Sequence, residues 1–217
     1  MSRPPRIDGV GTSTAGLVGR AAQGPTNQAV LVTSLVDYEH VFGGPQAGHE
    51  LFHGVRLFFA NGGRRAWAVR LGGQGAAAVT QALAALDAVG DIGLLCLPGL
   101  SGAGAVAAAS RYARSRGAFY VAEAAASRSA TLTAVRGIAA PDRGHVAVYL
   151  PRVVIRDPLH PAATMLFGPS AVIAGMLART DIERGVWAFA TNAHLQTSSA
   201  WARRSTRTGR RCCGETA

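Results

Sequence analysis

Apolar residues recur at helical spacing over residues 49–60 and predict an amphipathic helix there. The side chains that share its apolar face are Leu51, Phe52, Val55, Phe58 and Phe59. The segment Asn61, Gly62 and Gly63 is expected to end this helix, because glycine adopts the left-handed conformation of a helix C-terminus without steric cost. A strand with Trp67 buried in it is expected over residues 66–71.

Short apolar runs alternate with helical patterns along most of the remaining chain. We expect strands over 10–18, 29–33, 92–97, 118–122 and 145–150, and helices over 35–42, 76–89, 103–115 and 131–139. The turn residues at 24–27 are expected to fold the first strand back into the second. The pattern predicts an α/β fold: a mixed sheet with parallel strand-helix alternation in its centre and helices packed on the sheet.

The last third of the chain predicts an extended segment at 153–155, a turn-rich loop and a helix from Pro169 through 178. Thr180 with Glu183 matches a capping box that would open one further turn, and Trp187 after it is expected to be buried. Beyond residue 192 the composition shifts to Arg, Ser, Thr and Cys. We therefore divide the chain into a short leader (1–8), an α/β core (9–192) and a basic, disordered tail (193–217).

Charge and length narrow the range of partners. The 217 residues suffice for one compact domain, and 22 basic against 12 acidic residues give a net charge of +10. Arginines at 203, 204, 207, 210 and 211 crowd the tail and the rest are scattered, so we expect no specific nucleic-acid binding. No apolar run or leader predicts a membrane span or secretion signal, which places synthesis in the cytoplasm.

The three cysteines do not predict a disulfide framework or a metal knuckle. Cys96 lies within an apolar strand pattern and is expected to be a small buried side chain. Cys212 and Cys213 are adjacent and lack the two-residue spacing that metal or redox pairs prefer.

The residues HELFH at 49–53 match the HExxH motif of zinc metallopeptidases. In such enzymes two histidines on one helix face bind zinc and the glutamate activates a water, roles that would fall to His49, His53 and Glu50. Against this hypothesis, Arg56 would place a cation beside the metal, and the next acid, Asp87, has no motif around it. The other interpretation is a solvated helix edge with two surface histidines. The metallopeptidase remains our alternative function.

Residues 102–107 fit the GxGxxA pattern of dinucleotide-binding proteins, with Glu123 nineteen residues after Gly104. Four residues, 98–101, separate the preceding strand from the first glycine, which should follow the strand almost directly. In a segment so rich in Ala and Gly such a match arises easily, so we expect no cofactor.

Seven segments of the chain resemble, in order, the sequence pattern of contractile phage tail sheath proteins. They are 9–19 (GVGTSTAGLVG), 20–25 (RAAQGP), 30–34 (VLVTS), 38–44 (YEHVFGG), 55–71 (VRLFFANGGRRAWAVRL), 92–99 (IGLLCLPG) and 180–187 (TDIERGVW). The resemblance implies a tail-sheath-like core and a structural, non-catalytic role. Its fold-determining residues would be Phe58, Phe59, Asn61, Gly62, Gly63 and Trp67.

The resemblance also implies partners and a mechanism. Copies would form a helical sleeve around an inner tail tube, in contact with baseplate proteins, in a phage tail or a phage-like contractile injection system. Contraction of the sleeve would drive the tube into a target, without nucleotide or metal. The C-terminal domain usual in this family has no counterpart in the sequence, and the arm before the first strand is short. We therefore expect a truncated copy, such as a prophage gene with a changed reading frame beyond residue 192.

Overall fold

The structure of the protein is a computed structural model that describes residues 13–90, 92–125, 128–160, 162–188, 190, 195 and 200–201. The expected leader at 1–8 and all but three positions of the expected tail at 193–217 lie outside the described residues.

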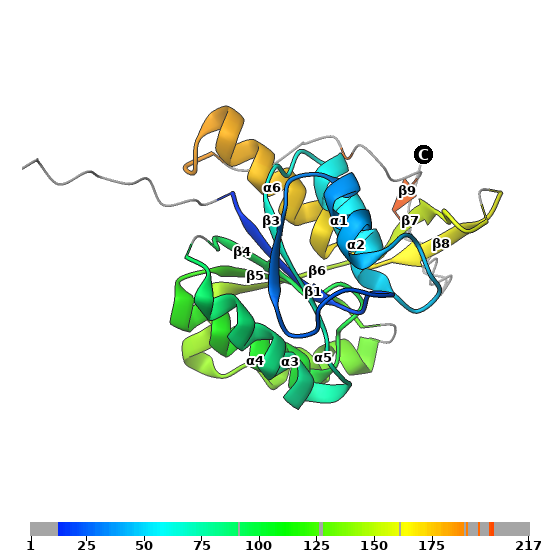
Figure 1. Cartoon of the computed structure of the whole chain (residues 1–217). Helices are drawn as coiled ribbons and strands as arrows, with labels where there is room; N and C mark the ends of the chain where they lie inside the picture. Colours follow the sequence, from blue (N-terminus) through cyan, green and yellow to red (C-terminus); the bar gives the residue numbers. More distant parts are fainter. Residues whose placement is uncertain are drawn as a thin grey trace, which may run out of the picture.

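A six-stranded sheet forms the centre of the molecule (Figure 1). Its strands are β1 (Ala15–Gly19), β2 (Ala29–Val32), β3 (Ala66–Arg70), β4 (Leu94–Cys96), β5 (Phe119–Glu123) and β6 (Val146–Tyr149). They lie in the order β2-β3-β1-β4-β5-β6, and all neighbours are parallel except β2 and β3. The predicted mixed sheet with a parallel centre is confirmed.

Helices cover both faces of this sheet (Figure 1). On one face lie α1 (Leu35–Phe42), α2 (Glu50–Ala60) and α6 (Ser170–Arg184), and on the other lie α3 (Gly75–Ala85), α4 (Ala103–Arg116) and α5 (Arg128–Arg136). Two short 3-10 helices, η1 (Leu86–Ala88) and η2 (Ala140–His145), follow α3 and α5. Among the described helices, none has both the length and the apolar character needed to cross a bilayer.

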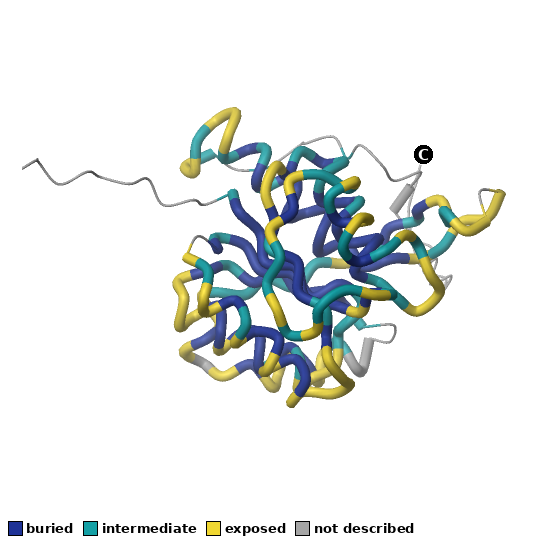
Figure 2. The backbone as a smooth tube through the Cα atoms, in the orientation of Figure 1, coloured by how far each residue is buried: buried dark blue, intermediate teal, exposed yellow. Residues whose placement is uncertain are grey.

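The sheet separates two hydrophobic cores. Figure 2 shows its strands buried between the two helical layers. Because side chains alternate along a strand, Leu17 and Cys96 face the core under α2 and α6, while Val18 and Leu95 face the core under α3 and α4. Cys96 is fully buried, as its sequence context predicts.

The prediction that β1 folds back on β2 is wrong. β2 pairs antiparallel with β3, with Leu31 opposite Trp67, while both neighbours of β1 are parallel to it. Asn27, in the left-handed region with φ 52°, still turns the chain, and its backbone N–H donates to the carbonyl of Arg70, the last residue of β3 (2.9 Å). The turn was recognisable from the sequence, but the partner of the strand after it depends on tertiary packing.

A second, smaller sheet was not predicted beyond one extended segment. It contains β7 (Val153–Arg156), β8 (Thr164–Phe167) and β9 (Ala200–Trp201) in the antiparallel order β8-β7-β9. β8 was missed because its four residues follow a loop dense in proline and histidine, and three of the four are not fully buried.

Two local predictions near the end of α6 are also wrong. Thr180 does not begin a new turn but lies inside the continuous α6, where its Oγ1 donates to the carbonyl of Met176 (2.9 Å). Trp187, expected to be buried, is 81% exposed, since it follows the helix at a point where it projects from the body of the molecule (Figure 1).

Candidate functional site

Helix α2 occupies the centre of the first core, where it packs on α6, α1 and β1. Phe58 is completely buried, and its ring lies 5.5 Å from that of the partly buried Phe59. The helix is buried nearly all round, because Phe52, His53 and Leu57 are also buried. Its buried surface is therefore wider than the single apolar face that the sequence predicted.

The helix ends at Asn61, as the sequence predicts. Gly62 has a φ of +103° and donates its N–H to the carbonyl of Phe59 (3.1 Å), and the N–H of Gly63 donates to that of Phe58 (3.0 Å). A side chain at Gly63 would collide with the Phe58 ring, since a Cβ there would lie 2.3 Å from it. Asn61 is fully buried, and its Nδ2 donates to the carbonyl of Leu57 (2.8 Å).

Helices α2 and α6 approach each other to backbone contact. A Cβ at Gly175 of α6 would lie 2.4 Å from the carbonyl oxygen of Phe58, and one at Gly62 would lie 2.7 Å from the Cβ of Arg179. These two glycines make the close approach possible, because any side chain would force the helices apart. The residues named from the NGG segment thus lie at a helix-helix crossing.

Trp67 lies in β3 and is half-buried against the core under α3. Its indole N–H has no hydrogen-bond partner within the part of the chain that the structure describes. The direct cross-strand neighbour is Leu31 of the edge strand β2, which is 39% exposed.

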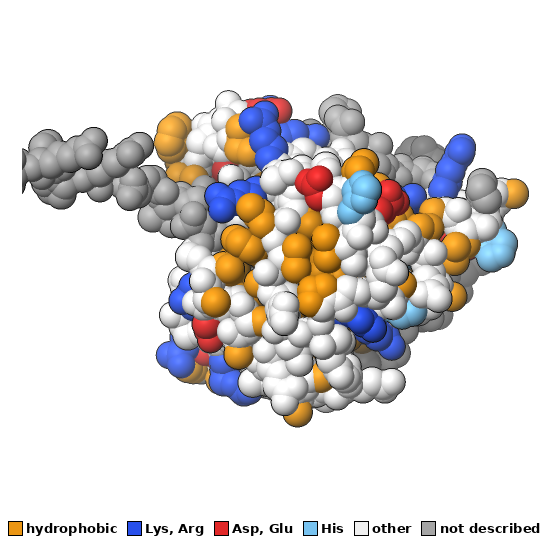
Figure 3. Space-filling model, viewed as in Figure 1, with side chains coloured by type: hydrophobic (Ala, Val, Ile, Leu, Met, Phe, Trp, Pro, Cys, Tyr) orange, Lys and Arg blue, Asp and Glu red, His pale blue; other side chains and the backbone are white. Residues whose placement is uncertain are grey.

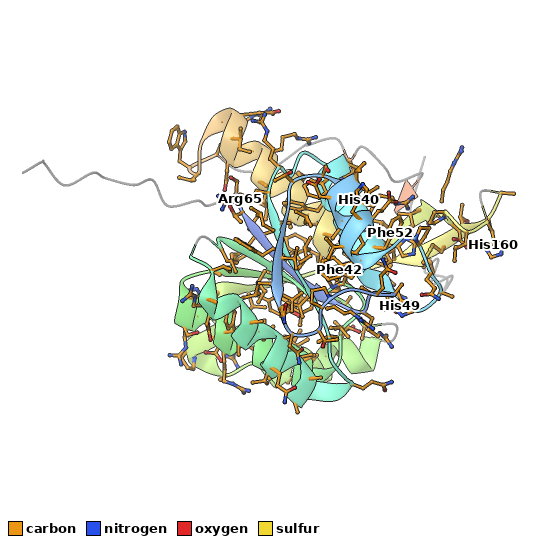
Figure 4. The ribbon with its side chains drawn as sticks, in the orientation of Figure 1. His40, Phe42, His49, Phe52, Arg65 and His160 are labelled. Atoms are coloured by element: carbon orange, nitrogen blue, oxygen red, sulfur yellow. The ribbon has the colours of Figure 1, made fainter. Side chains whose placement is uncertain are left out.

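The HExxH residues do not share one helix face. His49 precedes α2 with φ −113° and ψ 80°, outside the helical region (Figure 4). The Glu50 carboxylate accepts two hydrogen bonds from the Arg20 guanidinium, both 3.2 Å long. No three His, Cys, Asp or Glu side chains among the described residues are close enough together to hold a metal ion.

His53 is not the surface residue that the solvated-edge interpretation expects. It is 5% exposed, and its ring centroid lies 5.4 Å from that of Phe52 and 5.5 Å from that of Phe167. Burial, reinforced by the positive charge of Arg56, lowers the pKa of His53, while the negative charge of Asp157 acts in the opposite direction. This histidine was missed as a core residue because α2 is also covered on the side of β8.

The GxGxxA segment opens α4, with Gly102 at its N-cap. It borders a cleft of about 400 Å³ between the loops that follow β1, β3 and β4, and Arg20 also lines this cleft. Glu123 does not line it. The Glu123 carboxylate is buried and accepts hydrogen bonds from the Ser170 hydroxyl (2.5 Å) and the Gly99 N–H (3.1 Å). Burial raises the pKa of Glu123, against the effect of these two hydrogen bonds.

The chain was compared with protein-family models, curated proteins and solved structures. No protein-family model and no curated protein matches the chain. Solved structures do match. A chain of the anti-feeding prophage helical sheath in the contracted state superimposes with a TM-score of 0.70 at 24% identity, over 95% of this chain and 60% of that one.

The chain has the fold of a contractile sheath subunit. A chain of the anti-feeding prophage baseplate in the contracted state matches with a TM-score of 0.74 at 22% identity. The match covers 94% of this chain and 58% of that one. A chain of the contracted sheath complex of an extracellular contractile injection system, PVC, matches with a TM-score of 0.63 at 23% identity. The match covers 85% of this chain and 49% of that one. The sheath fold predicted from the sequence is thus confirmed, and the chain spans 60% or less of the length of these relatives.

Proposed function

We propose that the chain is a structural subunit of a contractile sheath, in a phage tail or a phage-like contractile injection system. The observation that carries this proposal is the match of 94–95% of the chain to subunits of sheath and baseplate assemblies. The seven ordered sequence segments that resemble tail sheath proteins support the proposal independently, because that resemblance lies in the amino-acid sequence alone.

The proposed mechanism is mechanical. Copies stack around an inner tube, and rotation of each copy as a rigid body converts an extended sleeve into a shorter, wider one. Two hydrophobic cores on a shared sheet and the backbone contact between α2 and α6 give the body the stiffness that such rotation needs. The partners are other copies of the chain, the inner tube and the baseplate.

The test is to find the chain in a particle. Cells that make the protein are lysed, particles are collected by high-speed sedimentation, and an antibody against the chain is applied with gold label for negative-stain microscopy. We expect label along the length of sheathed tubes. Label restricted to the soluble fraction, with unlabelled particles, would contradict the proposal. A strain lacking the gene controls for antibody specificity.

A further inference from the structure

The projecting end of α6 carries an exposed apolar surface. Ile182, Val186 and Trp187 are 39%, 61% and 81% exposed, and the indole of Trp187 lies over Gly185, where a Cβ would come within 2.5 Å of it. We call these three residues the α6 knob. Large apolar side chains gathered at one exposed point on a protein are typical of an interaction site.

Basic side chains lie near the projecting end of α6, on the side toward the body of the molecule (Figure 3). Arg64 and Ile182 line one shallow depression of about 170 Å³ at the ends of α2 and α6. Arg64 and Arg184 are exposed and form no ion pair with any described residue, while Glu183 is the acid that borders the same depression. Trp and Arg are, with Tyr, the residue types enriched among those that dominate binding energy at protein interfaces.

The outward face of α1 has the complementary character. Val36, Glu39 and His40 are exposed at helical spacing, and Val36 is 58% exposed. Figure 4 shows where His40 lies on this helix. Glu39 forms no ion pair within the described ranges. We call Val36, Glu39 and His40 the α1 face.

We propose that the α6 knob of one copy docks on the α1 face of a second copy of this chain, with Arg184 opposite Glu39 and Trp187 against Val36. Arg184 and Glu39 carry opposite charges, and each lies near an exposed apolar side chain, which argues for a second copy as the occupant. Two different surfaces of one chain make a head-to-tail contact, which repeats without closing and generates a helical stack. The inference rests on the proposed function, because a sheath needs such a repeating contact.

Charge exchange tests the contact in the purified full-length chain. We expect Arg184→Glu and Glu39→Arg each to weaken self-association in sedimentation velocity by about tenfold or more, and the double variant to recover most of it. Trp187→Ala is expected to weaken it at least as much. Leu132→Ala and Arg136→Glu, at exposed positions of α5, are the matched controls and should associate like the natural chain. Circular dichroism establishes that each variant is folded.

A natural chain that stays monomeric at every concentration would overturn the proposal. So would a double variant whose self-association is weakened by the sum of the two single effects.

Photo-cross-linking from a benzoylphenylalanine at position 187, within purified particles, separates the two proposals. Cross-links to the peptide that contains Val36 support the contact. Cross-links to another protein overturn the contact but leave the sheath assignment intact. Absence of the chain from particles, with charge rescue in the purified chain, would contradict only the sheath function.

Discussion

Individual glycines decide how closely the helices of the first core approach. At Gly175 the obstacle to a side chain is the backbone carbonyl of Phe58, which cannot move without unwinding α2. At Gly63 it is an aromatic ring that is itself enclosed. Close packing of this kind leaves no room for even one methyl group, so the effect of adding one is large.

Gly175→Ala is expected to lower the free energy of unfolding by about 2–3 kcal/mol, although alanine is the better helix former by about 1 kcal/mol. The reason is the predicted collision with the Phe58 carbonyl. Urea denaturation measures the change. Gly44→Ala, at an exposed glycine with no atom within 4 Å of its Cβ position, is the control and should change the free energy by less than about 0.5 kcal/mol. Equal stability of Gly175→Ala and the natural chain would refute the described helix contact.

His53 makes stability depend on pH. Because its pKa is lower in the folded state, the unfolded chain takes up the proton first as pH falls below the ordinary value of 6.5. The histidine therefore contributes stability above that pH and loses it progressively as the pH falls. Between about pH 7.5 and about pH 5.5 we expect the natural chain to lose about 1 kcal/mol more than His53→Phe, measured by urea denaturation.

A matched control separates this charge effect from general weakening of the core. Phe167→Leu removes the ring that packs on His53 but keeps the imidazole. It should lower stability at both pH values and retain the pH dependence. A His53→Phe chain whose stability falls with pH as steeply as that of the natural chain would show that another group is responsible.

At the scale of one element, α2 shows what its sequence could reveal. The positions of Phe58, Asn61 and Gly62 were predictable, because helical periodicity and glycine chemistry are local. The burial of His53 was not, because the residue that covers it, Phe167, lies in a strand more than a hundred positions away. The HExxH match was misleading for the same reason: a motif records spacing, whereas the N-cap position of His49 depends on where the helix begins.

Zinc is expected to leave the thermal midpoint of the protein unchanged. His49 lies outside the helix, Glu50 is engaged by Arg20, and His53 is enclosed by aromatic rings. A true site at a hundredfold excess of zinc over its dissociation constant would add about 2.7 kcal/mol and raise the midpoint by several degrees. Differential scanning calorimetry with and without zinc decides this, with His53→Phe as the control for binding elsewhere.

At the scale of the whole molecule, Glu123 joins parts that are distant in sequence. Its carboxylate, at the end of β5, holds the loop after β4 through Gly99 and the start of α6 through Ser170. Gly168 also lies against it, since a Cβ there would lie 2.0 Å from the carboxyl group. This is a structural role for a residue whose sequence context suggested only a dinucleotide-binding pattern. The order of strands that creates it was not predictable from any local pattern.

Glu123→Gln and Glu123→Ala are expected to differ sharply in their free energies of unfolding. The raised pKa means that Glu123 contributes stability at acidic pH that is lost as the pH rises through its folded-state value. Glutamine stays neutral and can accept from Gly99, so at about pH 7.5 we expect stability within about 1 kcal/mol of the natural chain. Alanine leaves two polar groups unpaired beside a cavity and should cost about 3 kcal/mol in urea denaturation. Equal losses in both variants would contradict the hydrogen-bonding role.

The burial of Cys96 makes its thiol a probe of whether the sheet opens during contraction. The thiol lies on β4 between β1 and β5, and burial raises the pKa of Cys96 well above its ordinary value. An alkylating reagent can therefore reach it only when the middle of the sheet comes apart. In Cys212→Ser/Cys213→Ser particles, Cys96 should stay unlabelled throughout contraction if each subunit turns without opening. Rapid labelling of Cys96 during contraction would show instead that the subunit partly unfolds as the sheath contracts.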